Sequence, residues 1–238
     1  MGFNLSFQDA NLSDLILVPT SLELEPLRRQ LSDTAADSSE AGEGIFFQRI
    51  GFGPIAAAAR TGALVARYRP SRVLLLGIAG SFDVQRFPVG TACRFDRVIC
   101  DGIGVGQSDQ FQSAEDIGWK QFAARDAMPE VSDAIALVAT FDPRVPCAGT
   151  LLSVCAGSAN SQDRDARAAR YPSAVAEDME GFAVAVACTL AGVPLQIIRG
   201  ISNEVGDREK ANWRIDDALR ATAEMAKQVL DHAWMPTV

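Results

Sequence analysis

The sequence predicts a single three-layer α/β domain, in which one twisted mixed sheet has helices on both of its faces. Short apolar runs alternate along the whole chain with segments of helical spacing, and no repeat or linker divides them. With 238 residues and 48% hydrophobic content, the chain is also long and apolar enough to bury the core of one such domain. We expect residues 1–13 to form an N-terminal tail and residues 14–238 to form the domain.

The expected elements follow from local patterns of apolar residues, taken in chain order. Strands are predicted where apolar residues run together between turn residues, at 14–20, 45–51, 72–82, 90–102, 135–141, 149–155 and 193–202. Helices are predicted from helical spacing at 22–31, 53–70, 116–128 and 161–172, after Glu180, and from Ile215 to about Trp234. Pro70 is expected to end the second helix, and residues 31–44, rich in Ser, Asp and Gly, to form a loop.

Charge and composition exclude several classes of partner. A net charge of −8 and a pI near 4.7 argue against nucleic acid, which is bound by basic surfaces. No apolar run approaches the eighteen residues of a membrane span, and the first residues lack the pattern of a signal peptide. The five cysteines are odd in number and have no C-x-x-C spacing, which indicates free thiols of a reducing cytoplasm.

His232 is the only histidine, and it lies near the C-terminus. A Ser-His-Asp or Cys-His mechanism would have to use it, and a histidine-rich metal site is impossible. Chemistry at this protein is therefore expected to depend on carboxylates, amides and backbone dipoles, with no metal and no organic cofactor.

Two glycine-containing loops follow predicted strands. The first, GFGPIAAAAR (51–60), has alanine at the third glycine position of a dinucleotide-binding turn, and no acidic residue follows at the distance expected for a ribose contact. It is expected to be a tight turn or a loop that lets backbone approach a small ligand. In LLLGIAGS (74–81), glycines around Ala79 would let a flat ring lie against the backbone; a close helix–strand contact would explain them equally well.

Four segments together carry a family resemblance: GFGPIAAA, LLLGIAGSF, AEDMEG and IIRGISN. In this order they resemble landmarks of the nucleoside phosphorylase and 5′-methylthioadenosine/S-adenosylhomocysteine nucleosidase superfamily, over nearly the whole chain after residue 13. Within it, GISNEVGDREKANWRIDDAL is most similar to the futalosine hydrolases of a menaquinone pathway. The resemblance implies a cytoplasmic nucleosidase that releases hypoxanthine from a small-molecule nucleoside, and a homo-oligomer.

Glu180, at the start of a predicted helix, is expected to hold the sugar. One ionised carboxylate can accept hydrogen bonds from both hydroxyls of a ribose 2′,3′-diol, and a helix start would keep it ionised. The resemblance implies the same role and places Met179 against the sugar. The alternative is a first-turn glutamate that only stabilises its own helix.

Glu23 is expected to activate the water. When a purine leaves, the sugar becomes oxocarbenium-like, and a base must deprotonate water on the opposite face. In PTSLELEP, Glu23 matches the family's water-activating glutamate better than Glu25 does, because it follows the strand by the expected step.

Asn203 is expected to recognise the base. The adenosine nucleosidases of the superfamily have aspartate here, whereas this chain has I-S-N. A carboxamide can donate its N–H to a 6-oxo group while its oxygen accepts N7–H, which suits hypoxanthine and mismatches adenine. The alternative is an asparagine that caps a turn. Because asparagine is a poor acid, the proton is expected to come from water or from Asp207.

Water is the expected acceptor rather than phosphate. Leu75 stands where the family's phosphorylases place an arginine, and Pro54 removes a backbone donor from the loop that would cradle phosphate.

The remaining site residues follow from the resemblance and from futalosine's 5′ benzoate chain, which needs apolar walls and one cation. Arg208, Lys210, Trp213 and Phe111 are the candidates for that chain, and Arg199 is expected to make a structural ion pair. Ala79, Gly80, Cys155 and Gly157 are expected to line the base. The competing functions are a methylthioadenosine/S-adenosylhomocysteine nucleosidase, a purine nucleoside phosphorylase, and a non-catalytic nucleoside-binding protein.

Overall fold

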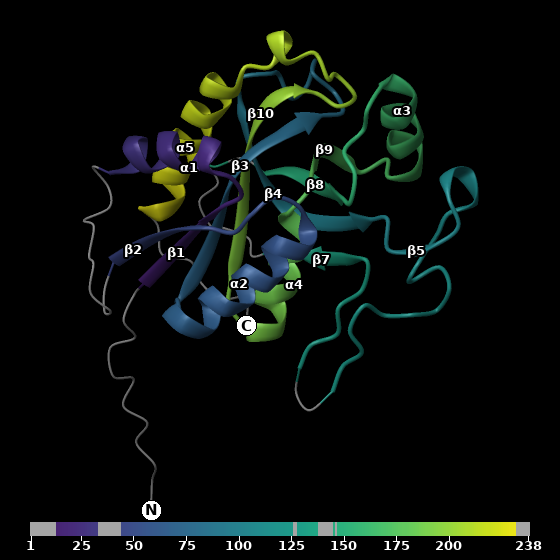
Figure 1. The fold of residues 1–238 in the computed structure, drawn as a ribbon, viewed down its shortest axis with the longest axis horizontal. Coiled ribbons are helices and arrows are strands. Elements are labelled where there is room, and N and C mark those ends of the chain that lie inside the picture. Colours follow the sequence, from purple (N-terminus) through teal and green to yellow (C-terminus); the bar gives the residue numbers. More distant parts are fainter. Residues whose placement is uncertain (1–12, 33–43, 126–127, 138–144, 146, 232–238) are drawn as a thin grey trace, which may run out of the picture.

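The computed structural model describes residues 13–32, 44–125, 128–137, 145 and 147–231 (Figure 1). Within these ranges one eight-stranded mixed sheet runs through the molecule, in the order β10-β4-β8-β9-β3-β1-β2 with β7 beside β4. Its strands are β1 (Ser13–Val18), β2 (Gly44–Arg49), β3 (Arg72–Ser81), β4 (Ala92–Asp101), β7 (Ala134–Ala136), β8 (Cys147–Val154), β9 (Ala174–Asp178) and β10 (Leu195–Glu204). The helices are α1 (Ser21–Leu31), α2 (Pro54–Tyr68), α3 (Ser161–Arg170), α4 (Gly181–Ala191) and α5 (Ile215–Leu230).

Strand β3 lies in the middle of this sheet and pairs with three other strands. It runs parallel to β1 and to β10, and its last residues pair antiparallel with β9. On the other side, β10 pairs antiparallel with β4, which continues in parallel through β8 to β9. The sheet therefore curls back on itself, so that the ends of β3, β9 and β10 lie beside one another.

Helices cover both faces of the sheet, as the sequence predicted. On one face α2 and α4 pack together, and Leu64 and Phe182 belong to the larger core cluster. On the other face α1 and α5 pack together, and Leu27 and Leu219 belong to a second cluster (Figure 1). No helix of the described residues is long and apolar enough to cross a membrane.

Local sequence explains where α2 begins and ends. Pro54 is at its first position, where the missing N–H costs no helical hydrogen bond, and Gly53 has a φ of +80° that favours glycine. Arg69 follows in the left-handed conformation, and Pro70 prevents continuation. The segment GFGP, predicted to be a tight turn or a loop that approaches a ligand, thus leads directly into the helix that was predicted after it.

The predicted helix at 116–128 is wrong. Its described residues, 116–125 and 128, form turns and isolated bridges, and Phe122 pairs with Val131 through two backbone hydrogen bonds of 3.1 and 2.9 Å. Val131 is fully buried, whereas Trp119 of the expected helix is 71% exposed. The segment therefore buries Val131 in the core and does not bury one face of a helix. Tertiary pairing has overridden the local helical pattern.

Other boundaries differ less. Strand β9 was not predicted, because its sequence AVAED is short and leads directly into Met179 and Glu180, which were interpreted as part of a sugar-binding motif. Of the strand expected at 135–141, β7 covers only Ala134–Ala136, and residues 138–141 lie outside the described residues. His232 and Trp234 also lie outside them, as does most of the expected N-terminal tail.

Candidate active site

A cavity of about 210 Å³ lies at the carboxyl ends of β3 and β10. Nine of the residues that the sequence predicted for the site line it: Glu23, Ala79, Gly80, Gly157, Met179, Glu180, Asn203, Arg208 and Trp213. The fold thus brings both predicted carboxylates and the predicted amide to one hollow, although they are far apart in the chain.

Cys155 and Phe111 do not line the cavity, which corrects two expectations. Phe111 lies beneath the guanidinium of Arg170, 5.0 Å from its ring centre, and its carbonyl accepts a 2.8 Å hydrogen bond from the same side chain. These two contacts with Arg170 hold the loop around Phe111 against α3. Cys155 is exposed beside Gly102, because the turn after β8 directs Gly157 to the cavity instead.

Glu23 is held by three donors at the start of α1. Its Oε2 accepts hydrogen bonds from the backbone N–H of Thr20 at 3.0 Å and from the Thr20 hydroxyl at 2.6 Å, and its Oε1 accepts from Ile78 N–H at 3.0 Å. The side chain is 4% exposed, whereas Glu25 is exposed and outside the cavity lining. A carboxylate has about four acceptor positions, so one remains for a water molecule.

Glu180 precedes α4 and is 5% exposed. Its Oε1 accepts a 2.8 Å hydrogen bond from Gly53 N–H, and its Oε2 lies 3.6 Å from Nη2 of Arg199. Burial raises the pKa of Glu180 to about 7; Arg199 opposes the rise and Asp178 adds to it. Burial therefore opposes the ionisation that was expected from the start of a helix.

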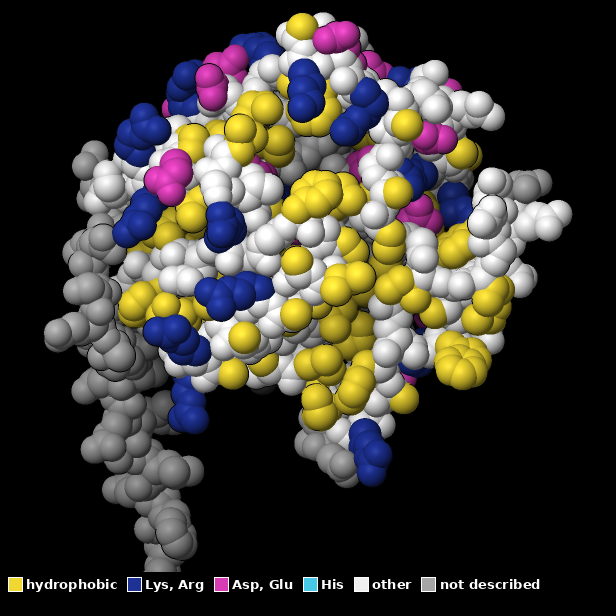
Figure 2. All heavy atoms as spheres, viewed as in Figure 1, with side chains coloured by type: hydrophobic (Ala, Val, Ile, Leu, Met, Phe, Trp, Pro, Cys, Tyr) yellow, Lys and Arg dark blue, Asp and Glu magenta, His cyan; other side chains and the backbone are white. Residues whose placement is uncertain are grey.

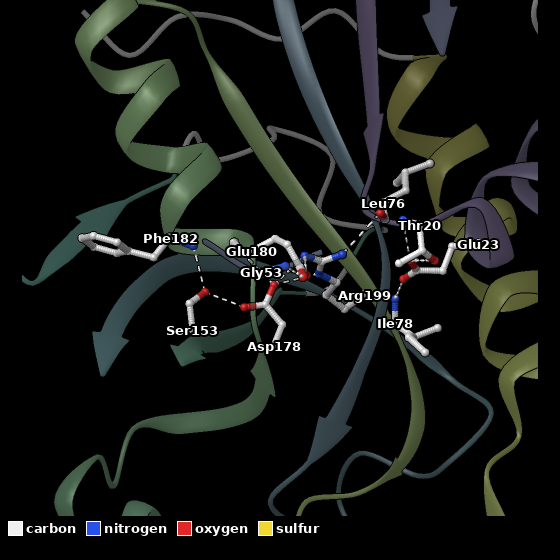
Figure 3. A network of polar contacts seen from close by, with 11 residues as sticks. Thr20, Glu23, Gly53, Leu76, Ile78, Ser153, Asp178, Glu180, Phe182 and Arg199 are labelled. Atoms are coloured by element: carbon white, nitrogen blue, oxygen red, sulfur yellow. Dashed lines mark hydrogen bonds and ion pairs between the residues drawn. The ribbon is translucent and has the colours of Figure 1, made fainter. Parts of the chain in front are cut away.

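Arg199 lies fully buried beneath the cavity and makes the structural ion pair that the sequence led us to expect (Figure 3). Its Nε and Nη2 donate to Oδ2 of Asp178 at 3.0 and 2.5 Å, and its Nη1 donates to the carbonyl of Leu76 at 3.3 Å. Asp178 also accepts from the hydroxyl of Ser153. A buried charge with this many partners is held in one orientation.

Gly77 shows how closely this network approaches Glu23. A Cβ added at Gly77 would lie 2.2 Å from Nη1 of Arg199 and 2.7 Å from Oε1 of Glu23. The Arg199 guanidinium therefore lies near both cavity carboxylates, with Glu180 on one side and Glu23 on the other (Figure 3). The sequence did not point to Asp178, and it indicated Gly77 only as one of the glycines around Ala79.

Asn203 is 7% exposed at the end of β10. Its Oδ1 accepts a 2.7 Å hydrogen bond from the Ser202 hydroxyl, and its Nδ2 donates to the carbonyls of Glu204 at 2.7 Å and of Asp207 at 3.5 Å. The carboxamide is therefore oriented by its neighbours, with one acceptor position on Oδ1 free and one weakly used N–H. The Asp207 carboxylate accepts hydrogen bonds from Glu209 N–H and from the Asn212 side chain, and it does not line the cavity. Asp207 is therefore not placed to donate a proton to the base, which was one of the two sources expected from the sequence.

The outer end of the cavity combines apolar side chains with one cation. Arg208 lies over the ring of Trp213, 5.1 Å from its centre, and Leu22 and Phe52 are lining residues that are 61% and 69% exposed. Among the described residues that line the cavity, Arg208 is the only arginine or lysine; Lys210 is exposed and outside it.

The part of the chain that the structure describes supplies no cluster of cations to this cavity that would hold phosphate. Leu75 is buried inside β3, and the nearby Gly53 N–H is already bound to Glu180. Pro54 has no N–H to offer.

Glu177 and Ser158 are further lining residues that the sequence did not predict. Glu177 accepts hydrogen bonds from the N–H and the hydroxyl of Ser158, at 2.8 and 2.7 Å, and from Arg167 at 2.9 Å. The motif EDME offered a signal, because three of its four residues are acidic and only Glu180 among these three was considered.

Comparison with known proteins supports a family assignment. A family model described as "Phosphorylase superfamily" matches residues 15–233. A futalosine hydrolase from Streptomyces coelicolor is 29% identical over 236 residues, covering 93% of this chain and 97% of that protein. One from Acidothermus cellulolyticus is 36% identical over 170 residues, covering 71% and 68%. A 5′-methylthioadenosine/S-adenosylhomocysteine nucleosidase from Marinomonas is 26% identical over 187 residues, covering 77% of each.

The fold is also found in solved structures. The native structure of futalosine hydrolase from Helicobacter pylori superposes with a TM-score of 0.72 at 16% sequence identity, covering 93% of this chain and 98% of that one. At this identity the likeness shows a shared nucleosidase-type fold.

Proposed function

The chain belongs to the phosphorylase superfamily, and we propose that it hydrolyses the N-glycosidic bond of futalosine, releasing hypoxanthine and dehypoxanthine futalosine in menaquinone biosynthesis. The observation that carries this proposal is that Glu23, Glu180 and Asn203 line one cavity. The names of the relatives at 29% and 36% identity support the same activity.

Glu180 binds the ribose. Its Oε1 is held by Gly53, and its Oε2 has no protein hydrogen bond among the described residues, with Arg199 at 3.6 Å. In its ionised form this carboxylate accepts hydrogen bonds from the 2′- and 3′-hydroxyls, while Met179 packs against the sugar.

Glu23 activates the water. The base leaves with the electron pair of the C1′–N9 bond, water adds to C1′ from the opposite face, and Glu23 takes the proton of that water. Thr20 and Ile78 hold Glu23 so that its one free acceptor position is available for this purpose.

Asn203 stabilises the departing base. Its free Oδ1 position accepts N7–H of hypoxanthine, and the N–H that points weakly toward Asp207 donates to O6. The N7 proton comes from solvent water, because Asp207 is committed to its own turn.

Water is the acceptor, and the reaction needs neither metal nor organic cofactor. Arg208 alone among the described lining residues is a cation, and the single observation that favours hydrolysis is this lack of an arginine cluster. Arg208 and Trp213 instead suit the carboxylate and ring of the 5′ chain.

We also propose a cytoplasmic homo-oligomer. All five cysteines are free thiols, as expected for a reducing compartment. Hydrophobic side chains gather on the surface over α2, α4 and β7 (Figure 2), and Ile55 of α2 is 86% exposed, which favours association with another copy.

A nucleoside panel tests the proposal. Futalosine, methylthioadenosine and inosine are incubated with the protein, with and without phosphate, and the free base is quantified by chromatography. We expect hypoxanthine from futalosine at a rate that phosphate does not change. Faster release of adenine from methylthioadenosine would favour the sibling nucleosidase, phosphate dependence a phosphorylase, and binding without release a nucleoside-binding protein.

A further inference from the structure

Three arginines attach α3 to the rest of the protein. None of the ten residues of this helix is buried, and Arg164, Arg167 and Arg170 follow at three-residue spacing, which places them along one side of it. Arg164 pairs with Glu204 at the end of β10. Arg170 donates hydrogen bonds to two carbonyls of the loop around Phe111. Arg167, between them, is the one that reaches the wall of the cavity.

Arg167 uses every nitrogen of its guanidinium. Nε donates to Asp101 at 3.1 Å, and Nη2 donates to the carbonyl of Ala156 at 2.7 Å. Nη1 donates to Oε2 of Glu177 at 2.9 Å and to the hydroxyl oxygen of Ser158 at 2.7 Å. Contacts with four acceptors fix the orientation of this planar group.

The turn from Ala156 to Ser158 forms part of the cavity wall, because Gly157 and Ser158 are lining residues. Arg167 binds this turn on both sides of Gly157, through the carbonyl of Ala156 and the hydroxyl of Ser158. Gly157 has no side chain by which it could be held, so its position depends on these two neighbours. A Cβ added at Gly157 would lie 3.9 Å from Nη1 of Arg208, so a displaced turn would also affect the cation of the cavity.

Arg167 is itself anchored to the sheet. Asp101 is the last residue of β4; its Oδ2 accepts from Arg167, and its Oδ1 accepts a 2.9 Å hydrogen bond from the Tyr171 hydroxyl. Neither Asp101 nor Tyr171 lines the cavity, and Arg167 does not line it either. Arg167 therefore connects the sheet to the cavity wall from outside.

Resting on the proposed function, we propose that Arg167 is a positioning residue, which holds Gly157 and Ser158 in the wall against which the nucleoside binds. Arg167 touches no substrate in this role and acts through the turn. Its loss should therefore weaken substrate binding while the catalytic groups stay in place. Glu23 in particular is held by donors outside this turn.

Arg170 provides the matched control, because it holds the same helix without touching the cavity wall. Its Nη1 and Nη2 donate to the carbonyls of Phe111 and Ser108, at 2.8 and 2.9 Å. Neither of these residues lines the cavity. If Arg167 only kept α3 in place, loss of Arg170 would have the same effect on the cavity as loss of Arg167.

The experiment compares the wild type with Arg167→Met, Arg167→Lys and Arg170→Met. Hydrogen exchange of the peptide 155–160, followed by mass spectrometry, reports on the turn without any ligand. In Arg167→Met we expect this peptide to exchange at least about tenfold faster. KM for futalosine should rise about tenfold while kcat stays within about threefold, the pattern of lost uniform binding.

The lysine variant separates charge from geometry. Arg167→Lys keeps the positive charge beside Glu177 but cannot bind four acceptors at once. It should regain part of the melting temperature lost in Arg167→Met and keep the raised KM, and it serves alone if the methionine variant fails to fold. Arg170→Met should lower the melting temperature without changing KM or the exchange of the peptide 155–160.

Wild-type exchange and wild-type KM in the Arg167 variants would overturn the inference, as would an equal rise of KM in Arg170→Met. Recovery of the wild-type KM in Arg167→Lys would also overturn it, because charge alone would then suffice. A wild-type protein that leaves futalosine intact would overturn the proposed function. Faster exchange of the peptide 155–160 in the Arg167 variants alone would then still support the positioning of the turn.

Discussion

The backbone N–H of Gly53 donates a 2.8 Å hydrogen bond to the carboxylate of Glu180, across 127 positions of the chain. This bond joins the loop before α2 to the residue before α4, and these two helices pack together. A donor that could have met an anionic co-substrate is thereby used to orient the carboxylate that we assign to the sugar.

The protonation of Glu180 should govern substrate binding. Its pKa is raised to about 7, so the ionised form that accepts both ribose hydroxyls increases as the pH rises. We expect KM for futalosine to fall by about tenfold between pH about 6 and about 8. Glu180→Gln should have a high KM that does not change over this range. A flat wild-type profile would contradict this assignment.

The same group should affect stability with the opposite sign. Its folded pKa of about 7 exceeds its ordinary value of 4.5, so its contribution to folding is complete below about 4.5 and is lost as pH rises through 7. Between these values the free energy of unfolding should fall by up to about 3 kcal/mol on its account. Urea unfolding of wild type and Glu180→Gln should show this slope in the wild type alone.

Replacing Glu23 should remove catalysis. We expect Glu23→Gln to lower kcat about 10²- to 10⁴-fold, the usual contribution of a general base. Glu25→Gln, at an exposed position two residues away, should remain within about twofold of the wild type. Melting curves should accompany both assays, because the amide would face a donor from Thr20 or Ile78. Reversed effects would identify Glu25 as the base.

Asn203→Asp should shift base preference. Aspartate can accept from a 6-amino group, so the ratio of kcat/KM for 6-amino- over 6-oxopurine nucleosides should rise at least about tenfold. In the variant a carboxylate oxygen would face the carbonyl of Glu204, which lowers activity on both kinds of nucleoside. Comparing the two values of kcat/KM as a ratio removes this common loss. An unchanged ratio would show that Asn203 does not recognise the base.

Gly77→Ala tests the packing of the two carboxylates around Arg199. The added Cβ would overlap Nη1 of Arg199 and Oε1 of Glu23, so we expect a loss of about 1–3 kcal/mol in stability and a reduced kcat. Gly62→Ala, in an open and exposed position of α2, should instead stabilise the protein by up to about 1 kcal/mol. Equal stability changes would contradict the close approach.

Arg208→Ala tests recognition of the 5′ chain. It should raise KM for futalosine about tenfold without changing that for inosine, which lacks the carboxylate. Lys210→Ala is the control, since that side chain is outside the cavity lining. A larger rise in KM from Lys210→Ala than from Arg208→Ala would show that Lys210, and not Arg208, binds the 5′ carboxylate.

Much of this site could be predicted from the sequence, because its landmarks are local. A continuous apolar run ending in glycines identified β3, and helical spacing after GFGP identified α2. Glu23 and Asn203 stand at the ends of such elements, where ligands of α/β sheets collect.

What escaped prediction depends on contacts distant in sequence. Phe111 was expected at the site but is held by Arg170 of α3. The helical spacing of 116–128 gave way to the bridge between Phe122 and Val131. Glu177 became visible only through the register of β9 with β3.

Hydrolysis of futalosine in ¹⁸O-labelled water tests the central claim most directly. Mass spectrometry should find free hypoxanthine and one ¹⁸O atom on the sugar product, with both formed about 10²- to 10⁴-fold more slowly by Glu23→Gln. Intact futalosine after prolonged incubation with the folded wild-type protein, or a sugar phosphate as the product, would contradict the account.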